Sequence, residues 1–164
     1  NHRGGYRDNP PGSDGSKVVI SDTDHIFGIG GDGRWVWQSF LRGLHPIYMD
    51  DFGLQSWKEE ARMAMGQTRA FAERVNMVHM RPLVTIASSN FCLANPAAVK
   101  AEYLIYVPDG GNVNVNLKAT PGFLTAEWFD PSTGENVTGL LVQGGKWRSF
   151  SSPFRGDAVL YLRS

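Results

Sequence analysis

Hydrophobic residues recur with two different periods along the chain, and the change occurs near residue 80. In the front part, short β-branched runs alternate with stretches in which apolar residues recur at helical spacing. From about residue 81 onward, apolar and polar residues alternate with the period of two that is typical of half-buried strands. The pattern predicts an α+β protein with two domains, residues 1–78 and residues 79–164.

The front part is predicted to contain two parallel strands joined by a helix. The apolar runs at residues 17–21 and 46–49 are typical of strands that are buried on both faces. Between them, Asp32 is suited to cap the N-terminus of a helix over residues 34–42, and Gly43 stands where a helix commonly ends in glycine. The segment therefore predicts a βαβ unit.

A second helix is predicted to follow this unit, over residues 56–74. Ser56 and Glu59 have the spacing of a capping box, in which the serine caps the helix and the glutamate bonds back to it. An apolar stripe then recurs at helical spacing. Its members are Trp57, Ala61, Ala64, Met65, Thr68, Ala72 and Val75.

Ionisable side chains follow both predicted strands of the front part. Asp22, Asp24 and His25 come directly after the first strand, and Asp50 and Asp51 come after the second. The carboxyl ends of parallel strands meet at one edge of the sheet, where α/β proteins place their chemistry. We therefore expect a functional site at this edge.

The back part is predicted to be an antiparallel β-sandwich. Turn sequences such as PDGG and PSTG separate its short alternating segments. The expected strands cover residues 83–87, 91–94, 102–107, 112–118, 123–130, 135–142, 146–151 and 157–162. Packing between the two sheets or against the first domain is favoured for five aromatic residues, and a carbohydrate platform is the alternative. They are Trp128, Phe129, Trp147, Phe150 and Phe154.

Composition excludes several classes of function. Sixteen basic residues balance 16 acidic residues, which disfavours nucleic acid as a partner. No apolar run approaches the roughly 20 residues of a membrane span, so we expect no membrane insertion. The single cysteine, Cys92, lies in an apolar run and is predicted to be a buried, inert thiol. Residues 1–16 are rich in Gly, Pro, Asp and Asn and are predicted to form a loop.

Several motifs, taken in order, resemble the C-terminal part of a family of bacterial proteins classed as glycoside hydrolases. They are SDTDHIFGIGGDGRWVWQSFLRGLHPIYMDD, ARMAMGQTRAFAERVNM, EYLIYVPDGG, EWFDPSTGE, GGKWRSFSSPF and DAVLYL. Members of this family join a (β/α)8 barrel to a β-sandwich known as the putative collagen-binding domain of a collagenase. The resemblance implies that residues 1–78 are the terminal βαβα elements of an incomplete barrel, and that residues 79–164 are an accessory sandwich.

The resemblance also implies roles for the acidic residues. It places the nucleophilic carboxylate at Asp22 or Asp24, with the other carboxylate in support, and His25 could orient a carboxylate or hold a sugar hydroxyl. On an extended strand the two aspartates would share a face about 6.5 Å apart. Trp35, Asp50 and Asp51 are the candidate substrate-binding residues.

Two other interpretations of these residues stay open. The polar tips could simply tie down loops through aspartate turns. Asp24, His25, Asp50 and Asp51 could instead hold a metal ion, although the group has one histidine and no HExxH motif occurs. We expect neither a metal nor another cofactor. The glycines at residues 28–31 do not form the GxGxxG motif of a dinucleotide site.

The resemblance sets further expectations about partners. The chain alone should be inactive, because the acid/base residue and most of a cleft for a carbohydrate substrate would lie in an upstream barrel segment of the same protein. The exposed barrel edge should then favour self-association. The family implies a secreted or periplasmic location. The competing hypothesis is a β-sandwich module that binds carbohydrate or matrix protein without catalysis.

Overall fold

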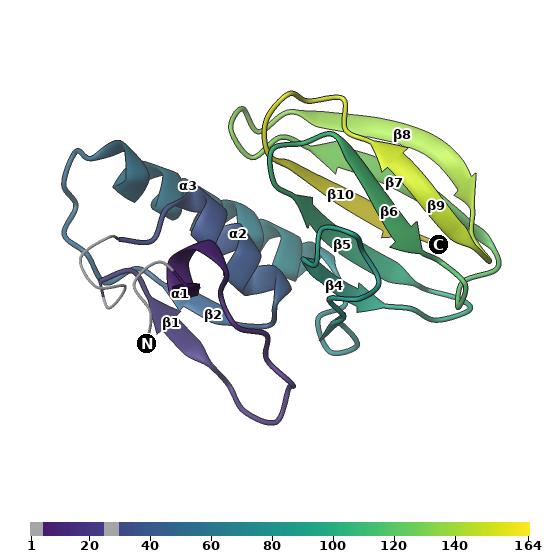
Figure 1. Ribbon diagram of the computed structural model, residues 1–164, viewed down its shortest axis with the longest axis horizontal. Helices are drawn as coiled ribbons and strands as arrows, with labels where there is room; N and C mark the ends of the chain where they lie inside the picture. The colour runs from purple at the N-terminus through teal and green to yellow at the C-terminus, as the bar shows by residue number, and fades with distance from the viewer. Residues whose placement is uncertain (1–4, 25–29) are drawn as a thin grey trace. The chain divides into compact units, whose positions relative to one another are not determined.

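The computed structural model describes residues 5–24 and 30–164 of the chain. The chain divides into two compact units, Asn1–Val75 and Asn76–Ser164. The first unit contains helices and a small parallel sheet, whereas the second consists of antiparallel strands (Figure 1). The protein is therefore α+β. Among the described residues, no helix is both long enough and apolar enough to cross a membrane.

The first unit contains the predicted succession of strand, helix, strand and helix. Strand β1 (Ile20–Asp22) pairs in parallel with β2 (His45–Ile47). Helix α2 (Gly33–Leu41) connects the two strands, and α3 (Ser56–Arg74) follows them. The predicted loop at the N-terminus contains one helical turn, α1 (Gly5–Asp8).

The two strands are shorter and more exposed than expected. The prediction of burial on both faces was wrong, because Val18 is 74% exposed, Ile20 62% and Ile47 39%. Among the described strands, β1 and β2 pair only with each other. A two-stranded sheet has too few neighbours to cover both of its faces.

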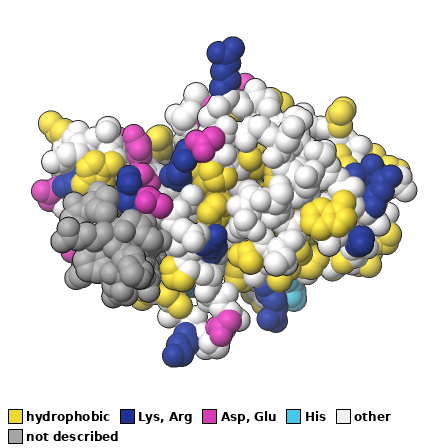
Figure 2. Space-filling view, viewed as in Figure 1, with side chains coloured by type: hydrophobic (Ala, Val, Ile, Leu, Met, Phe, Trp, Pro, Cys, Tyr) yellow, Lys and Arg dark blue, Asp and Glu magenta, His cyan; other side chains and the backbone are white. Residues whose placement is uncertain are grey.

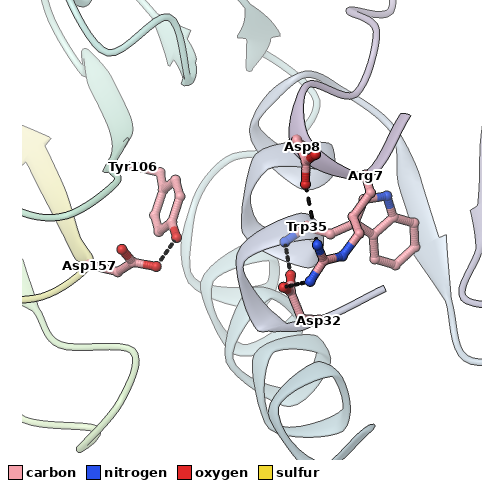
Figure 3. Close-up of polar contacts among 6 residues, drawn as sticks. All are labelled: Arg7, Asp8, Asp32, Trp35, Tyr106 and Asp157. Atoms are coloured by element: carbon pink, nitrogen blue, oxygen red, sulfur yellow. Dashed lines mark hydrogen bonds and ion pairs between the residues drawn. The ribbon is translucent and has the colours of Figure 1, made fainter. Parts of the chain in front are cut away.

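Helix α2 begins and ends as its sequence predicts. The Asp32 carboxylate accepts a hydrogen bond from the Trp35 backbone N–H at 2.8 Å, and Gly43 has a φ of +77°. The second carboxylate oxygen of Asp32 accepts from Arg7 at 2.6 Å, so α1 is fastened to the start of α2 (Figure 3). Trp37 lies in the core, where its ring meets Phe71 of α3 edge-on with centroids 5.7 Å apart.

Helix α3 spans the predicted residues but lacks the predicted capping box. Its N-cap is Gln55, which makes no side-chain capping bond, and Ser56 is already helical. The Gln55 carbonyl accepts the backbone N–H of Lys58 at 3.0 Å. The Glu59 carboxylate instead pairs with Arg62, which lies one turn further along the helix. The Arg62 side chain therefore takes the Glu59 carboxylate that a capping box would bond to the backbone N–H of the N-cap residue.

The second unit consists of two antiparallel sheets. The larger sheet has the strand order β3-β4-β5-β10-β7-β8, and β6 pairs with β9 in the smaller one. The strands of the unit are β3 (Arg81–Pro82), β4 (Cys92–Asn95), β5 (Glu102–Val107), β6 (Asn112–Asn116), β7 (Phe123–Phe129), β8 (Asn136–Gln143), β9 (Trp147–Ser151) and β10 (Ala158–Arg163). The smaller sheet forms a second layer over the larger one, which makes the arrangement sandwich-like (Figure 1).

A single hydrophobic core joins the two sheets. Val113, Val115 and Phe150 enter it from β6 and β9. The larger sheet contributes Tyr103, Ile105, Leu124, Trp128, Leu160 and Leu162 among others. Cys92 is fully buried in this core, as predicted, and burial raises the pKa of its thiol far above the ordinary value.

One predicted strand of the second unit is wrong. Residues 84–86 of the predicted strand 83–87 form a turn, and Ala87 makes only an isolated bridge, to Val115. The Ile86 backbone N–H donates to the Leu83 carbonyl at 3.1 Å, which curls the segment before it can pair along its length. The alternation of apolar residues there therefore reflects contact with the core and not pairing in a sheet.

A bulge interrupts the pairing of β8 with β7. Thr125 pairs with Leu141 and Glu127 pairs with Thr138, so two residues of β8 lie opposite one residue of β7. A side chain at Gly139 would meet the Ala126 carbonyl oxygen at 2.5 Å. Glycine therefore permits the close approach of the two strands at the bulge.

Candidate functional site

The ends of β1 and β2 are tied together by one buried residue, Thr23. Its backbone N–H donates to the Ile47 carbonyl at 3.2 Å, and its hydroxyl oxygen accepts from the Met49 backbone N–H at 3.0 Å. Thr23 is 0% exposed. The first bond extends the strand pairing by one backbone bond and the second adds a side-chain bond, so the residues that follow each strand are held at the same edge of the sheet.

This edge brings together the sequences that were predicted to be acidic tips. Asp22 is the last residue of β1 and is half-buried, and the exposed Asp24 follows in a turn. Because β1 ends at Asp22, strand alternation does not set the direction of Asp24, and the expected strand spacing between the two aspartates does not apply. His25 lies outside the described residues.

Asp51 is engaged in an ion pair. Its carboxylate is bonded to the ammonium group of Lys58, in the first turn of α3, and accepts from the Gly53 backbone N–H at 3.1 Å. The hydrogen bond from Lys58, with the added bond from Gly53, lowers the pKa of Asp51. The same hydrogen bond raises the pKa of Lys58, against the opposing effect of its burial. Asp51 therefore anchors the segment to α3.

Asp50 presents a different chemical environment. It is half-buried, and its Oδ2 atom is buried without a hydrogen-bond partner among the described residues. A buried carboxylate oxygen nearly always has a partner. Its charge also contributes to the raised pKa of Lys58, so the two groups are neighbours. Asp50 can thus accept a hydrogen bond from a bound molecule without losing one.

An aromatic and basic cluster lies beside these carboxylates. The Arg62 guanidinium donates to the Tyr48 hydroxyl at 3.0 Å and lies 5.4 Å from the centroid of that ring. It also lies 5.6 Å from the Phe52 ring centroid, and Phe52 is 82% exposed. The Tyr48 hydroxyl donates to the Asp51 carbonyl. The cluster fixes the segment after β2 and leaves an exposed aromatic ring at the edge.

Trp35 does not occupy the place expected of a sugar-stacking residue. Its side chain is 1% exposed, and its ring packs so closely on Gly31 that an added Cβ there would lie 2.4 Å from it. Trp57 is half-buried, and its ring lies equally close to Gly30, which has a φ of +75°. Of the described aromatic residues near the strand ends, Phe52 is the one whose exposure suits contact with a ligand.

Sequence reasoning missed Thr23, Lys58 and Arg62. Threonine in an acidic tip is easily taken for a loop residue, and its locking role depends on the register of β2. The available signal for Lys58 was a basic residue in the first turn of a helix that closely follows two aspartates. No three His, Cys, Asp or Glu side chains gather as a metal-binding group within the described residues.

A shallow pocket of about 180 Å³ lies elsewhere in the first unit. Its lining includes His45 and Pro46, which begin β2, together with Phe40 of α2 and Met65 of α3. The acidic residues follow the other end of β2. This pocket is therefore separate from the candidate site.

Comparison with known proteins supports the resemblance on which these expectations rest. Residues 89–163, most of the second unit, match the family described as "Putative collagen-binding domain of a collagenase". A search of curated proteins gives no match.

Two solved structures share the fold of the chain at low sequence identity. One, named "Glycoside hydrolase", has a TM-score of 0.62 and 10% identity and covers 97% of this chain and 45% of its own. The other is a glycoside hydrolase family 5 protein from Bacteroides vulgatus ATCC 8482, with a TM-score of 0.55 and 14% identity, covering 80% of this chain and 35% of its own. The chain spans less than half the length of either protein. It thus combines a segment that matches the collagen-binding-domain family with a fold found within glycoside hydrolase structures.

Proposed function

We propose that the chain is the C-terminal part of a glycoside hydrolase-like enzyme. In this proposal, β1, α2, β2 and α3 are the closing elements of a (β/α)8 barrel, and the second unit is its accessory sandwich. The observation that carries the proposal is that Thr23, which directly follows β1, makes two hydrogen bonds to the end of β2, since they gather two acidic segments at the carboxyl edge of a parallel sheet.

The exposed apolar side chains of the small sheet support the barrel interpretation. Val18 just before β1, Ile20 in β1 and Met49 after β2 are more than half exposed, at 74%, 62% and 54%. Large apolar side chains gathered on one strand pair are normally covered by another element. Further parallel strands and their helices would provide that cover.

The chemistry expected at this edge uses two carboxyl groups. Asp22 acts as the nucleophile or charge stabiliser, with Asp24 and His25 in support, while a carboxylic acid from an earlier strand protonates the leaving oxygen. The Oδ2 of Asp50, which has no partner among the described residues, accepts a hydrogen bond from a sugar hydroxyl, and Phe52 offers a ring face to the sugar. The Lys58–Asp51 pair positions the segment that carries Asp50.

The proposal is tested with the protein expressed together with the sequence that precedes this segment in its gene. We expect release of reducing ends from a neutral polysaccharide, and a loss of about a thousandfold or more in kcat for Asp22→Asn. Glu73→Gln, on the exposed surface of α3, is the matched control and should retain full activity. Hydrolysis by Asp22→Asn at the rate of the parent protein would overturn the assignment.

A second candidate function is a binding module without catalysis, favoured by the family match over residues 89–163. In that case the second unit holds carbohydrate or matrix protein whether or not the first unit belongs to an enzyme. For both candidates we propose a secreted or periplasmic location, which the match to a collagen-binding-domain family supports. Detection of the mature protein in the periplasm or culture medium checks this location.

A further inference from the structure

The outer face of the β6–β9 sheet carries an ordered set of uncharged polar side chains. Antiparallel pairing sets Asn112 opposite Ser151, Asn114 opposite Ser149, and Asn116 opposite Trp147. Five of these six residues are exposed and Asn116 is half-buried, whereas Val113, Val115 and Phe150, which alternate with them, turn toward the core. We call these six residues the β6–β9 outer face.

This face is chemically neutral. Arg148 is the one charged residue in the two strands, and it belongs to the opposite set of alternating positions, where its Nε donates to the Gln143 carbonyl at 2.6 Å. Figure 2 shows the region over β6 and β9 as largely white, with Lys or Arg side chains at one edge. A neutral polar surface favours a neutral polar ligand, because it offers no counter-charge to an ionic one.

Hydrogen bonding within the face leaves donors unused. The side-chain oxygen of Asn112 accepts from the Ser151 hydroxyl at 2.6 Å, and that of Asn116 accepts from the Lys118 backbone N–H at 3.1 Å. The amide nitrogens of both, and the whole side-chain amide of Asn114, have no partner among the described residues. The three amides therefore form a row of donors spaced about 7 Å apart along β6.

The backbone beneath this row is held firmly on both sides. Asn114 pairs with Ser149 of β9, and on its other side its backbone N–H donates to the Ser88 hydroxyl at 2.9 Å. The Ser88 backbone N–H donates in turn to the Asn114 carbonyl at 2.9 Å. A ligand would therefore meet side chains on a fixed backbone, which reduces the entropy lost on binding.

The residue types are unexpected for a merely solvated strand face. Asparagine is among the residues depleted in strands, because its side chain competes for backbone hydrogen bonds, yet it occupies all three outward positions of β6. Cross-strand or turn bonds account for Asn112 and Asn116, but for the Asn114 side chain the described residues provide no such bond. Trp147 is 47% exposed, whereas Trp128 and Phe150 lie in the core.

We propose that the β6–β9 outer face binds a neutral polysaccharide laid along the two strands. Sugar hydroxyls both donate and accept hydrogen bonds, as do amides and serine hydroxyls, and the C–H face of a sugar ring packs on an indole. This inference deepens the binding role in the proposed function and does not depend on catalysis by the first unit.

The test is affinity electrophoresis of the 164-residue protein in gels that contain hydroxyethylcellulose, xyloglucan, arabinoxylan or galactomannan, with alginate as a charged comparison. At least one neutral polymer should retard the protein. Trp147→Ala should raise Kd about tenfold and Asn114→Ala about fivefold, as expected for the loss of an aromatic contact and of a hydrogen bond. Phe123→Ala and Asn136→Ala are the matched controls, since both residues are exposed and begin other strands.

Several outcomes would overturn the proposal. They are the absence of retardation by every neutral polymer, equal weakening by the control variants, and binding to immobilised type I collagen that the same two variants abolish. Circular dichroism of each variant separates loss of binding from loss of folding. Because the chain with Asp22→Asn should bind as the parent does, failure of the catalytic proposal and failure of this one give different results.

Discussion

The structure shows which hydroxyl is the donor in the buried hydrogen bond between Tyr103 and Thr120. The donor's identity predicts how much substitution of each residue should lower the free energy of unfolding. The Thr120 hydroxyl donates to the Ala97 carbonyl at 2.7 Å, and the same oxygen lies 2.7 Å from the Tyr103 hydroxyl. A hydroxyl has one proton to donate. Tyr103 must therefore donate to Thr120, and both side chains are 0% exposed.

Tyr103→Phe and Thr120→Val should therefore lower the free energy of unfolding by different amounts. Tyr103→Phe removes one donor but leaves the Thr120 hydroxyl bonded to Ala97, so we expect a loss of about 1 kcal/mol in the free energy of unfolding. Thr120→Val leaves the Tyr103 hydroxyl buried without an acceptor and also deprives the half-buried Ala97 carbonyl of its donor. We expect a loss of about 2 to 3 kcal/mol. Adding Tyr103→Phe to Thr120→Val should then restore about 1 kcal/mol, because it removes the orphaned hydroxyl.

The assay uses the single cysteine as a probe of the second unit alone. Cys92 lies in the same core, and both its burial and the raised pKa of its thiol protect it from alkylation until that unit unfolds. Pulsed labelling at increasing urea gives a midpoint, and about 1 kcal/mol moves it by about 0.5 to 1 M. Thr138→Val, at an exposed position of β8, is the control and should leave the midpoint unchanged. If the double variant is less stable than Thr120→Val, the placement of the proton is wrong.

Three further predictions concern other parts of the chain. Gly144→Ala should cost more than about 3 kcal/mol or prevent folding of the second unit, because its Cβ would lie 1.8 Å from the Thr120 carbonyl oxygen. Gly156→Ala meets nothing within 4 Å and should be neutral in the same thiol-labelling assay. Burial would raise the pKa of Asp130, but hydrogen bonds from the turn that follows it prevail and lower that pKa. Because this pKa is lower in the folded state, the ionised carboxylate stabilises the fold at pH values above the unfolded pKa. The stability advantage over Asp130→Asn should therefore decline as the pH falls below about 4 and be lost once the pH is below the lowered pKa. Light scattering of the 164-residue protein should reveal self-association that Ile20→Lys abolishes, and a monomer at every concentration would contradict this.

Local chemistry explains which parts of the fold were predictable. Helix α2 was predicted because Asp32 and Gly43 mark its ends through bonds within a few residues of sequence. Most strands of the second unit were predicted because alternation and turn residues are also local signals. The capping box failed because Arg62 competes for Glu59, and this competitor lies outside the motif itself.

The position of the candidate site in the fold could be predicted from the sequence, but the hydrogen bonds and ion pair that hold its residues could not. Two acidic segments after consecutive parallel strands are visible in the sequence, so their edge of the sheet could be predicted. The role of Thr23 depends on which residue of β2 it faces, and the pairing of Asp51 with Lys58 depends on where α3 begins. Trp35 was expected to contact a sugar because of its residue type, but its side chain is buried and packs in the interior.

The bulge in β8 bears on how the second unit avoids aggregation. Among the described strands β8 pairs with β7 alone, and Leu140 and Leu141 stand 82% and 64% exposed on this rim of the sheet. A straight rim of this kind would be a template onto which a neighbouring molecule could add a strand. The extra residue breaks the ladder midway and twists the rim, so an incoming chain finds no long run of aligned backbone groups. Gly139, which permits the bulge, thus helps to keep the protein soluble, and we expect substitutions of Gly139 to promote fibril formation.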